Sequence, residues 1–255
     1  MRYECTTGLS DEQFEELYER IRQVVVGRGS RGGRPAILGL WVQLEMLLVA
    51  VRQNLNQMAI GDLYGVSQPT VSRIYRSLMP LLDQVLCVNE PPIHAVFAHR
   101  EVLVDGTDVP TRNRKGADHN YSGKRHRQGL NIQVAAAASG SLLAVSAPMP
   151  GCRHDRRAIT ECGWETILNQ HTWLADPAYQ GTSAITPKKR TKNRDLTHHE
   201  RVTNKTISSR RSAVERCIGH LKNWKILATG YRGILAELPN VIRIITRLEF
   251  YRLGW

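Results

Sequence analysis

Three acidic residues have the types and surroundings expected of a metal-dependent active site. Asp105 ends the apolar run VLVD and Asp176 ends the run WLAD, and each is followed by turn-forming residues. Chains commonly place chemistry where buried strands end. Glu215 is the only acid between residues 206 and 236, in a stretch rich in Arg and Lys. Three converging carboxylates would bind Mg²⁺ or Mn²⁺, and two such ions would cleave a phosphodiester.

Other interpretations of individual acids stay open. A single Asp before Gly or Pro more often stabilises a turn than binds a metal. Asp108 lies three residues after Asp105, and Asp155 belongs to a His-Asp pair, so both could approach the ions. For Asp155, capping of a helix that starts at Arg156 is an equally good explanation. Both residues therefore rank behind the first three acids as candidates.

Two patterns that suggest other ligands are incomplete. Cys152, His154 and Cys162 lack a second pair of ligands at the spacing of a zinc site. Residues 116–124, GADHNYSGK, have six residues between their glycines instead of four, and Arg125 replaces the Ser or Thr of a phosphate-binding loop. We expect neither zinc nor a nucleotide cofactor.

The charge of the chain favours a polyanionic partner. Lys and Arg number 35 against 23 Asp and Glu, a formal net charge of +12. Residues 186–225, around Glu215, contain 12 basic and 3 acidic residues, and residues 112–127 contain 6 and 1. Surfaces normally mix both signs, so runs of one sign beside a carboxylate cluster favour a DNA backbone over solvent alone. An anionic membrane surface is the second possibility.

The sequence shows no pattern of a membrane or secreted protein. Its longest apolar stretch, residues 36–51, is interrupted by Gln43 and Glu45 and is shorter than the roughly 18 residues of a spanning helix. The N-terminal residues lack the apolar core of a signal peptide. The five cysteines are odd in number and far apart, so we expect a reducing compartment such as the cytoplasm.

The first ninety residues have helical periodicity. Ser10 and Gln13 form a capping box before an amphipathic helix that reaches Gly27. Residues 27–35, GRGSRGGRP, predict a basic loop, and apolar residues from Ile37 to Val51 predict a buried helix.

A helix-turn-helix is predicted within residues 56–78. Gly61 provides space where two short helices cross, and Gly65 makes the turn. Val71 and Ile74 would hold the second helix against the first. A plain helical hairpin is the alternative, and the basic composition favours DNA binding. The exposed side chains expected to contact DNA are Gln68, Thr70 and Arg73.

The pattern changes from helical to extended after the prolines of NEPPI, residues 89–93. Beyond them we predict a strand ending at Asp105, a hairpin turning at Ser139-Gly140 and a strand ending at Asp176. One helix is predicted over residues 154–168, another over 207–224 and a last one after Pro239. This order predicts an α/β fold with a mixed sheet in residues 91–255, behind a helical DNA-binding domain in residues 1–90.

The chain resembles the DDE transposases of the IS5 group and the related Harbinger-type endonucleases. The resemblance covers most of the chain, in the order VDGTDVP, YSGKRHRQGLNIQ, MPGCRHDRRAI, LADPAYQG and RRSAVERCIGHLKNWKIL. It implies an RNase H-like catalytic domain in which Asp105, Asp176 and Glu215 are catalytic and bind the metal. Arg211 and Lys222 resemble the basic residues of the signature around its Glu and would contact DNA. Ser208 stands where the signature has Tyr, so no role is assigned to it.

The resemblance implies a transposase that binds the terminal repeats of an insertion element, cleaves a strand and joins its 3′ hydroxyl to target DNA. It also implies two ions of Mg²⁺ or Mn²⁺, a homo-oligomer when two ends are paired, and a bacterial, nucleoid-associated location in the cytoplasm. No membrane partner is expected. A DNA-binding regulator without catalysis and a domesticated endonuclease of the same fold are the alternatives.

Overall fold

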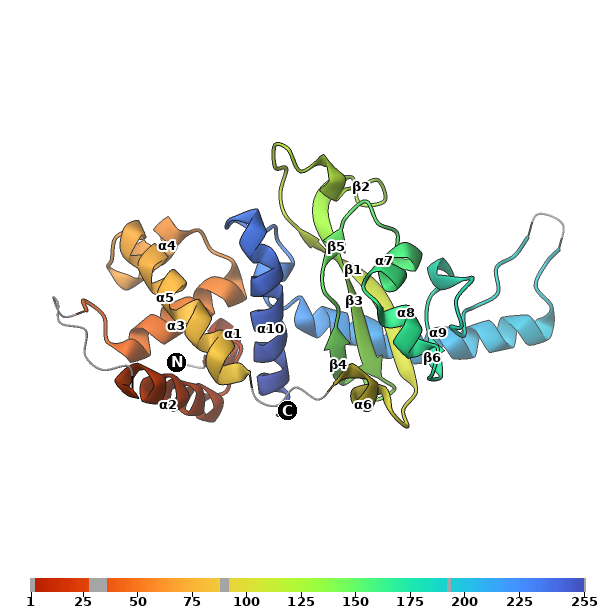
Figure 1. The fold of residues 1–255 in the computed structure, drawn as a ribbon, viewed down its shortest axis with the longest axis horizontal. Helices are drawn as coiled ribbons and strands as arrows, with labels where there is room; N and C mark the ends of the chain where they lie inside the picture. Colours follow the sequence, from red (N-terminus) through yellow and green to blue (C-terminus); the bar gives the residue numbers. More distant parts are fainter. Residues whose placement is uncertain (1–2, 28–35, 88–91, 192–193, 255) are drawn as a thin grey trace. The chain divides into compact units, whose positions relative to one another are not determined.

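The computed structural model describes residues 3–27, 36–87, 92–191 and 194–254 (Figure 1). The chain divides into two units: residues 1–90 with 223–255 form a helical unit, and residues 91–222 form a unit built on a sheet. No helix in the described ranges is long and apolar enough to cross a membrane.

The helical unit follows the predicted order of helices. The capping box is confirmed, because the Ser10 backbone donates to the Gln13 side chain and the Gln13 backbone to the Ser10 hydroxyl. The helix predicted from Ile37 begins later, after Gly39, and Ile37 is 73% exposed. Most of the predicted basic loop lies outside the described residues. The helices are α1 (Tyr3–Thr6), α2 (Asp11–Gly27), α3 (Leu40–Gln53), α4 (Gln57–Tyr64), α5 (Gln68–Leu86), η3 (Lys225–Leu227), η4 (Leu235–Glu237) and α10 (Leu238–Arg252).

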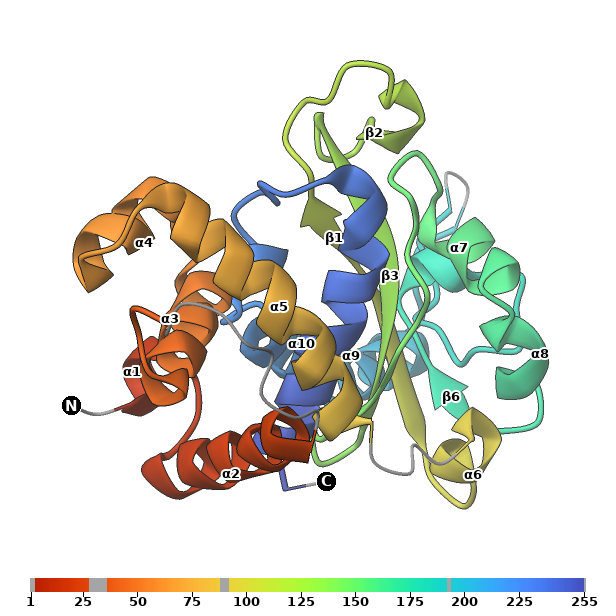
Figure 2. The same ribbon diagram turned by 60° about the vertical axis from the view of Figure 1, so that its left-hand side comes forward.

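The helix-turn-helix is formed by α4 and α5, which lie together in Figure 2. Gly65 ends α4 in the left-handed conformation, as predicted. A Cβ atom on Gly61 would lie 2.5 Å from the carbonyl oxygen of Val66, so this position requires glycine. Val71 and Ile74 are buried. The sequence therefore identified both the turn and the buried face of the second helix.

The last 33 residues belong to a different unit from the one expected. Sequence analysis placed all of residues 91–255 in one domain, whereas residues 223–255 pack with the N-terminal helices. The apolar face of α10 packs on α5. Trp224 is buried, lies under the guanidinium of Arg52 and donates to the buried carboxylate of Glu249. These long-range contacts have no local signature in the sequence.

The second unit contains a six-stranded mixed sheet with the strand order β2-β3-β1-β6, in which β4 and β5 also pair with β3. β1 pairs antiparallel with β3 and parallel with β6. The strands are β1 (Val102–Pro110), β2 (Tyr121–Ser122), β3 (Arg127–Ala137), β4 (Leu142–Val145), β5 (Met149–Pro150) and β6 (Trp173–Leu174). The helices are α6 (Ile93–Phe97), η1 (Asp118–Asn120), α7 (Asp155–Glu161), α8 (Trp164–Leu168), η2 (Pro177–Tyr179) and α9 (His198–Leu221).

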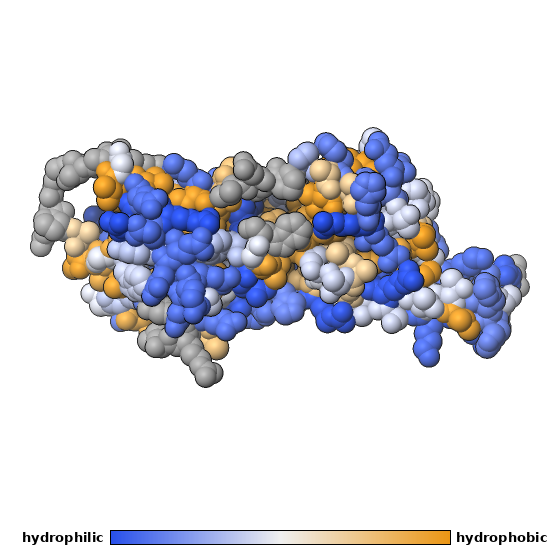
Figure 3. All heavy atoms as spheres, turned by 90° about the horizontal axis from the view of Figure 1, so that it is seen from below, coloured by the Kyte–Doolittle hydropathy of each residue, from blue (hydrophilic) through white to orange (hydrophobic). Residues whose placement is uncertain are grey.

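Helices cover both faces of this sheet (Figures 1 and 2). On one face, Phe97, Trp164 and Trp173 form a buried cluster between the sheet and helices α6, α7 and α8. On the other face, α9 packs along β1 and β3. The part of α9 that extends beyond the sheet is mostly hydrophilic on the face seen in Figure 3. The sheet thus holds β1 between two helical layers.

Three elements differ from their predicted bounds. β1 continues to Pro110, so Asp105 lies within the strand and not at its end. The helix predicted over residues 154–168 is two helices, interrupted at Gly163, which has a φ of 80°. The helix predicted from Ile207 begins nine residues earlier, at His198, because Thr197 and Glu200 form a capping box there.

Candidate active site

Asp105 lies on β1, and Asp176 follows the neighbouring parallel strand β6 by two residues. Val102 pairs with Trp173 and Leu103 with Leu174, so the two aspartates are at the same level of the sheet. Asp176 follows β6 as the N-cap of η2, and its Oδ1 accepts a hydrogen bond of 2.7 Å from the Ala178 backbone. The predicted strand-end position therefore holds for Asp176 and is wrong for Asp105. Pairing of strands, and not strand termination, brings the two acids to one level.

Asp105 is crowded by other carboxylates. Its side chain is 19% exposed, and Oδ1 accepts from the backbone of Gly106 at 2.9 Å. Burial raises the pKa of Asp105 to about 6, against the opposing effect of Arg211, and the negative charges of Asp176 and Asp155 raise it further. A carboxyl group in this environment gains from a nearby cation.

The third predicted acid, Glu215, lies on α9 and is linked to Asp105 through Arg211. The Nη2 atom of Arg211 is 3.3 Å from Asp105 Oδ2 and 3.9 Å from Glu215 Oε1. Arg211 is largely buried, whereas the Glu215 side chain is 59% exposed. One guanidinium thus stands between two of the three acids.

The donor set fits a divalent cation, but its side chains do not form a closed cage. Among the described residues, no three His, Cys, Asp or Glu side chains are placed closely enough to bind one ion. Asp105 and Asp176 offer carboxylate oxygens, the ligands that Mg²⁺ and Mn²⁺ prefer. Arg211 already supplies positive charge there.

Asp108 has a different environment from Asp105. Arg127 donates to its Oδ2 at 2.6 Å, and Arg125 and Lys222 lie 3.6 Å from its Oδ1. Burial acts to raise the pKa of Asp108, but Lys222, Arg127 and Arg125 outweigh it, and the pKa lies below its ordinary value. Lys222 also donates to the Asp108 carbonyl oxygen at 2.9 Å. Asp108 therefore joins β1 to the start of β3 and the end of α9.

The residues predicted to contact DNA lie at the start of α5. Gln68 and Arg73 are exposed, and Thr70 is half-buried. Arg73 donates to the Thr70 hydroxyl, which also contacts the Ser67 hydroxyl. Gln68 donates to Gln57 of α4. The start of the second helix thus presents amide, hydroxyl and guanidinium groups, which can bond to bases or phosphates.

Sequence analysis missed the polar residues that surround Asp155. Asn131 donates to Asp155 Oδ1 at 2.8 Å, and the carboxylate lies against Gly106 of β1. Asn131 and Gln133 lie two residues apart on β3, whereas Tyr179 belongs to η2 and is brought to them only by the fold. The available signal was the glycine of VDGT, which stands where a β-strand would favour a larger residue.

The chain combines a helix-turn-helix in one unit with two aspartates on or beside neighbouring strands of an α/β unit. Residues 104–249 match the family model described as DDE superfamily endonuclease. Residues 42–87 match the model described as helix-turn-helix of DDE superfamily endonuclease. The chain belongs to the DDE superfamily endonucleases.

A related curated protein agrees with this family. The chain is 32% identical over 224 residues to the "Putative transposase for insertion sequence element IS112" of Streptomyces albus G. The match covers 87% of this chain and 83% of that protein. No solved structure matches the chain.

Proposed function

We propose that the protein is a transposase of the IS5 group that binds the terminal repeats of an insertion element and catalyses cleavage and transfer of a DNA strand. The observation that carries this proposal is the placement of Asp105 and Asp176 at one level of neighbouring strands, with mutually unfavourable charges. The curated relative is described as a transposase, which supports the same function. The sheet unit is proposed to be RNase H-like.

Asp105, Asp176 and Glu215 are the proposed ligands of Mg²⁺ or Mn²⁺. Two bound ions would activate water or a 3′ hydroxyl and stabilise the leaving oxygen. Asp105 lies within a paired strand and Asp176 accepts a cap hydrogen bond from Ala178, so they would need little reorganisation. Glu215, on α9, would be the ligand that moves, because its side chain is exposed and its one ion pair within the described residues is with Arg211.

Arg211 and Lys222 are the proposed phosphate contacts beside these acids. Both extend from α9 or its C-terminal end toward β1, where Arg211 contacts Asp105 and Lys222 contacts Asp108. With a cation held by Asp105, the Arg211 guanidinium would be available to a phosphate. Gln68, Thr70 and Arg73 would read the terminal repeats, and two copies of the chain would pair two DNA ends. The proposed location is the bacterial cytoplasm, on the nucleoid.

Cleavage of a supercoiled plasmid that carries the terminal repeats tests this function. With Mg²⁺ or Mn²⁺ the chain should nick the DNA, and Asp176→Asn should reduce nicking to background, because an amide cannot supply the charge that holds the ion. DNA binding by Asp176→Asn should be at least as strong, since a negative charge near phosphate is removed. Retained nicking by this variant would reject the assignment of Asp176.

A metal titration separates the ligand from the phosphate contacts. Excess Mn²⁺ should partly restore cleavage by Glu215→Gln, because weakened binding is compensated by concentration. Lys222→Ala and Arg211→Ala should keep metal binding and lose strand transfer, with the milder loss in Arg211→Ala. If Mn²⁺ restores Lys222→Ala as well as Glu215→Gln, this division of roles is wrong.

The recognition helix is tested by alanine substitution of Gln68, Thr70 and Arg73 together. Each lost base contact should cost about 1 to 3 kcal/mol of discrimination. The fold should be kept, because Val71 and Ile74 provide the buried contacts of this helix. Competition between terminal-repeat and random DNA measures the effect, and unchanged preference would show that another surface reads the sequence.

A further inference from the structure

Three cations surround a single carboxylate, Asp108, near the end of β1. Arg127 donates to Asp108 Oδ2 from both Nε and Nη2, at 3.0 and 2.6 Å. The Nε atom of Arg125 and the Nζ atom of Lys222 each lie 3.6 Å from Oδ1. No other carboxylate in the described ranges forms an ion pair with any of these three side chains. Three positive charges against one negative charge leave a local charge of +2.

Asp108 does not use all the hydrogen-bond donors of these cations. A guanidinium has five N–H groups, and Arg127 directs two of them to the carboxylate. The Arg125 Nε atom is too far from the carboxylate for a hydrogen bond, and among the described residues its guanidinium donates to no other group. Lys222 directs one of its three donors to the Asp108 carbonyl oxygen. The cluster therefore has both charge and donors left for an anion.

The cations lie nearer to solvent than the carboxylate that they share. The Asp108 side chain is 12% exposed, whereas those of Arg125 and Arg127 are 48% and 47% exposed. The outer side of the cluster is therefore positive. Burial lowers the pKa of Lys222, and the charges of Arg125 and Arg127 lower it further, against the opposing effect of the carboxylate. An ammonium group in this environment gains from a nearby anion.

The two arginines are held in place by the turn between β2 and β3. Ser122 of β2 pairs with Arg127 of β3, and β2 lies at one end of the sheet unit (Figures 1 and 2). His126, between the two arginines, has a φ of 51°, a conformation that residues other than glycine rarely adopt. Arg125 and Arg127 reach the same carboxylate from either side of this residue. Groups that are already positioned lose less freedom when they bind a ligand.

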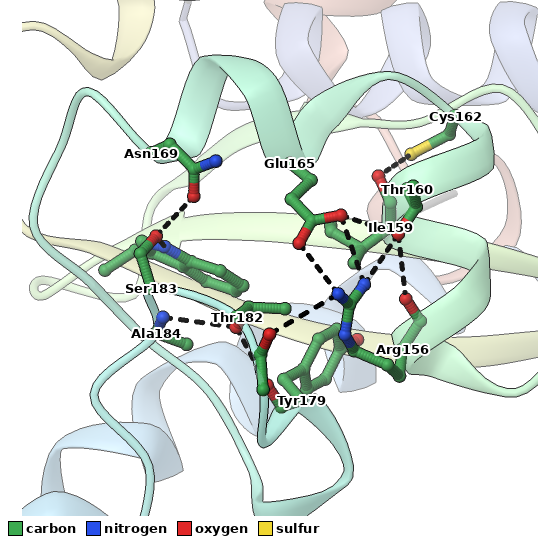
Figure 4. Close-up of polar contacts among 12 residues, drawn as sticks. Arg156, Ile159, Thr160, Cys162, Glu165, Asn169, Tyr179, Thr182, Ser183 and Ala184 are labelled. Carbon is green, nitrogen blue, oxygen red and sulfur yellow. Dashed lines mark hydrogen bonds and ion pairs between the residues drawn. The ribbon is translucent and has the colours of Figure 1, made fainter.

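Arg156 of α7 shows a balanced arrangement in the same unit. Its guanidinium contacts the Glu165 carboxylate at 3.0 Å (Figure 4). It also donates to the Thr160 hydroxyl at 2.6 Å and to the Gly181 carbonyl oxygen at 3.4 Å. One positive charge thus faces one negative charge. The excess of positive charge around Asp108 is therefore not a general property of the arginines of this unit.

We propose that Arg125, Arg127 and Lys222 form a phosphate site, which binds one phosphodiester group of the DNA. The planar guanidinium group matches the geometry of phosphate oxygens. This inference rests on the proposed action on DNA and adds the two arginines of the β2–β3 turn to it.

The position of the cluster on β1 indicates which phosphodiester it binds. Asp108 lies three residues after Asp105 on β1, which is about 10 Å along a strand. Phosphates of one DNA strand recur about every 3.4 Å along the duplex axis. The bound phosphodiester should therefore lie about three nucleotides from the bond held at Asp105.

The salt dependence of DNA binding tests the proposal. Binding of a short duplex of random sequence is measured in EDTA, without cleavage. The Arg125→Gln/Arg127→Gln variant should bind more weakly, and the slope of log affinity against log salt concentration should fall in magnitude by about 1, the effect of one lost phosphate contact. Arg156→Gln/Arg157→Gln is the matched control, because it removes the same charge from arginines that contact glutamates. Its slope should be native.

Two results would overturn the proposal. One is a native slope in the folded Arg125→Gln/Arg127→Gln variant, and the other is an equal loss of slope in the α7 control, since net charge would then explain both. If the double variant does not fold, Arg125→Gln replaces it, because the Arg125 guanidinium makes no hydrogen bond among the described residues. A native slope in Arg125→Gln overturns the proposal in the same way.

Neutral methylphosphonate linkages, placed one at a time in terminal-repeat DNA, locate the contact. A linkage about three nucleotides from the cleaved bond should weaken binding by the native chain and should not weaken binding by Arg125→Gln/Arg127→Gln any further. Equal sensitivity of both proteins at every linkage overturns the proposal. Failure of the native chain to bind either DNA rejects the proposed function and this inference with it. Native binding and cleavage by the double variant reject this inference alone.

Discussion

Asp105 and Asp108 lie three residues apart on β1 and have opposite electrostatic environments. Asp105 has one guanidinium partner at 3.3 Å and is crowded by the charges of Asp176 and Asp155, which with burial raise its pKa to about 6. Asp108 has three cationic neighbours, and its pKa is lowered. The difference separates a carboxylate that still needs a cation from one that already has its cations. Perturbation of the first kind is typical of functional sites.

The largest expected difference between the two aspartates is in DNA cleavage. Asp105→Asn should reduce nicking of a terminal-repeat plasmid to background, because the proposed metal ligand loses its charge. Asp108→Asn should nick at a rate within about tenfold of the native rate, since it disturbs only the positions of Arg125, Arg127 and Lys222. A plasmid-nicking time course with both variants makes the comparison. If Asp108→Asn is as inactive as Asp105→Asn, the distinction between their roles is wrong.

The second-largest expected difference between Asp105 and Asp108 is in the pH dependence of the free energy of unfolding. The raised pKa of Asp105 means that the folded chain holds a proton which the unfolded chain releases near the ordinary value of 3.8. The favourable contribution of Asp105 to the free energy of unfolding is complete below pH 3.8. It is lost as the pH rises through about 6. Since two pKa units correspond to about 3 kcal/mol, Asp105→Asn should gain up to about 3 kcal/mol relative to the native chain between pH 4 and 7. Urea unfolding in EDTA measures this change.

The control for this experiment is Asp118→Asn, which removes an exposed aspartate of the same unit. It shows what the removal of a surface charge alone does to stability. A pH-independent difference for Asp105→Asn would show that burial and the neighbouring carboxylates do not disfavour its ionised form.

Asp108→Asn should lower the free energy of unfolding at neutral pH, by less than the gain expected for Asp105→Asn. The lowered pKa of Asp108 gives a contribution that is present at neutral pH and is lost as the pH falls below its ordinary value of 3.8. Its partners are partly exposed, so we expect a loss of about 1 to 2 kcal/mol, between the values for surface and buried ion pairs. Unfolding at pH 7 measures it. The loss should shrink in 1 M salt, and a salt-independent loss would point to packing instead of charge.

Sequence patterns predicted the helices, strands and turns better than the contacts between them. The capping box at Ser10, the turn at Gly65 and the hairpin at Gly140 are local, and the structure confirms all three. The start of α9 was missed although Thr197 and Glu200 form a capping box, because the apolar periodicity begins only near Ile207. The placement of residues 223–255 depends on packing of distant helices, which local patterns do not encode.

The same limit applies to the candidate site. The residue types in VLVDGT and WLADPA were sufficient to select Asp105 and Asp176. Pairing of β1 with β6 sets them at one level, and that pairing cannot be deduced from either segment alone. The sequence also could not distinguish Asp155 from a helix cap, because the distinction depends on the position of Asn131, 24 residues earlier.

The smallest expected effect concerns a third carboxylate, Glu200. Like Asp108, it already has several hydrogen-bonding and cationic partners. It accepts from the Thr197 backbone at 2.9 Å and contacts Lys188 and Arg194 at 3.1 and 2.8 Å. The backbone hydrogen bond from Thr197 and the contact with Lys188 lower the pKa of Glu200 to about 2. Its environment therefore marks it as a structural residue, even though it lies on α9 with Glu215.

Thr197→Ala tests this assignment by removing half of the capping box. The hydroxyl of Thr197 accepts from the Glu200 backbone, and loss of such a cap costs about 1 kcal/mol. Faster hydrogen exchange of the first-turn amides of α9 should report the loss, with cleavage unchanged. Thr206→Ala is the matched control, because the Thr206 hydroxyl only donates to the Val202 carbonyl within the helix. Thr197→Ala could instead abolish cleavage while the first-turn amides of α9 stay protected from hydrogen exchange. In that case the ion pairs and hydrogen bonds of Glu200 do not mark it as a structural residue.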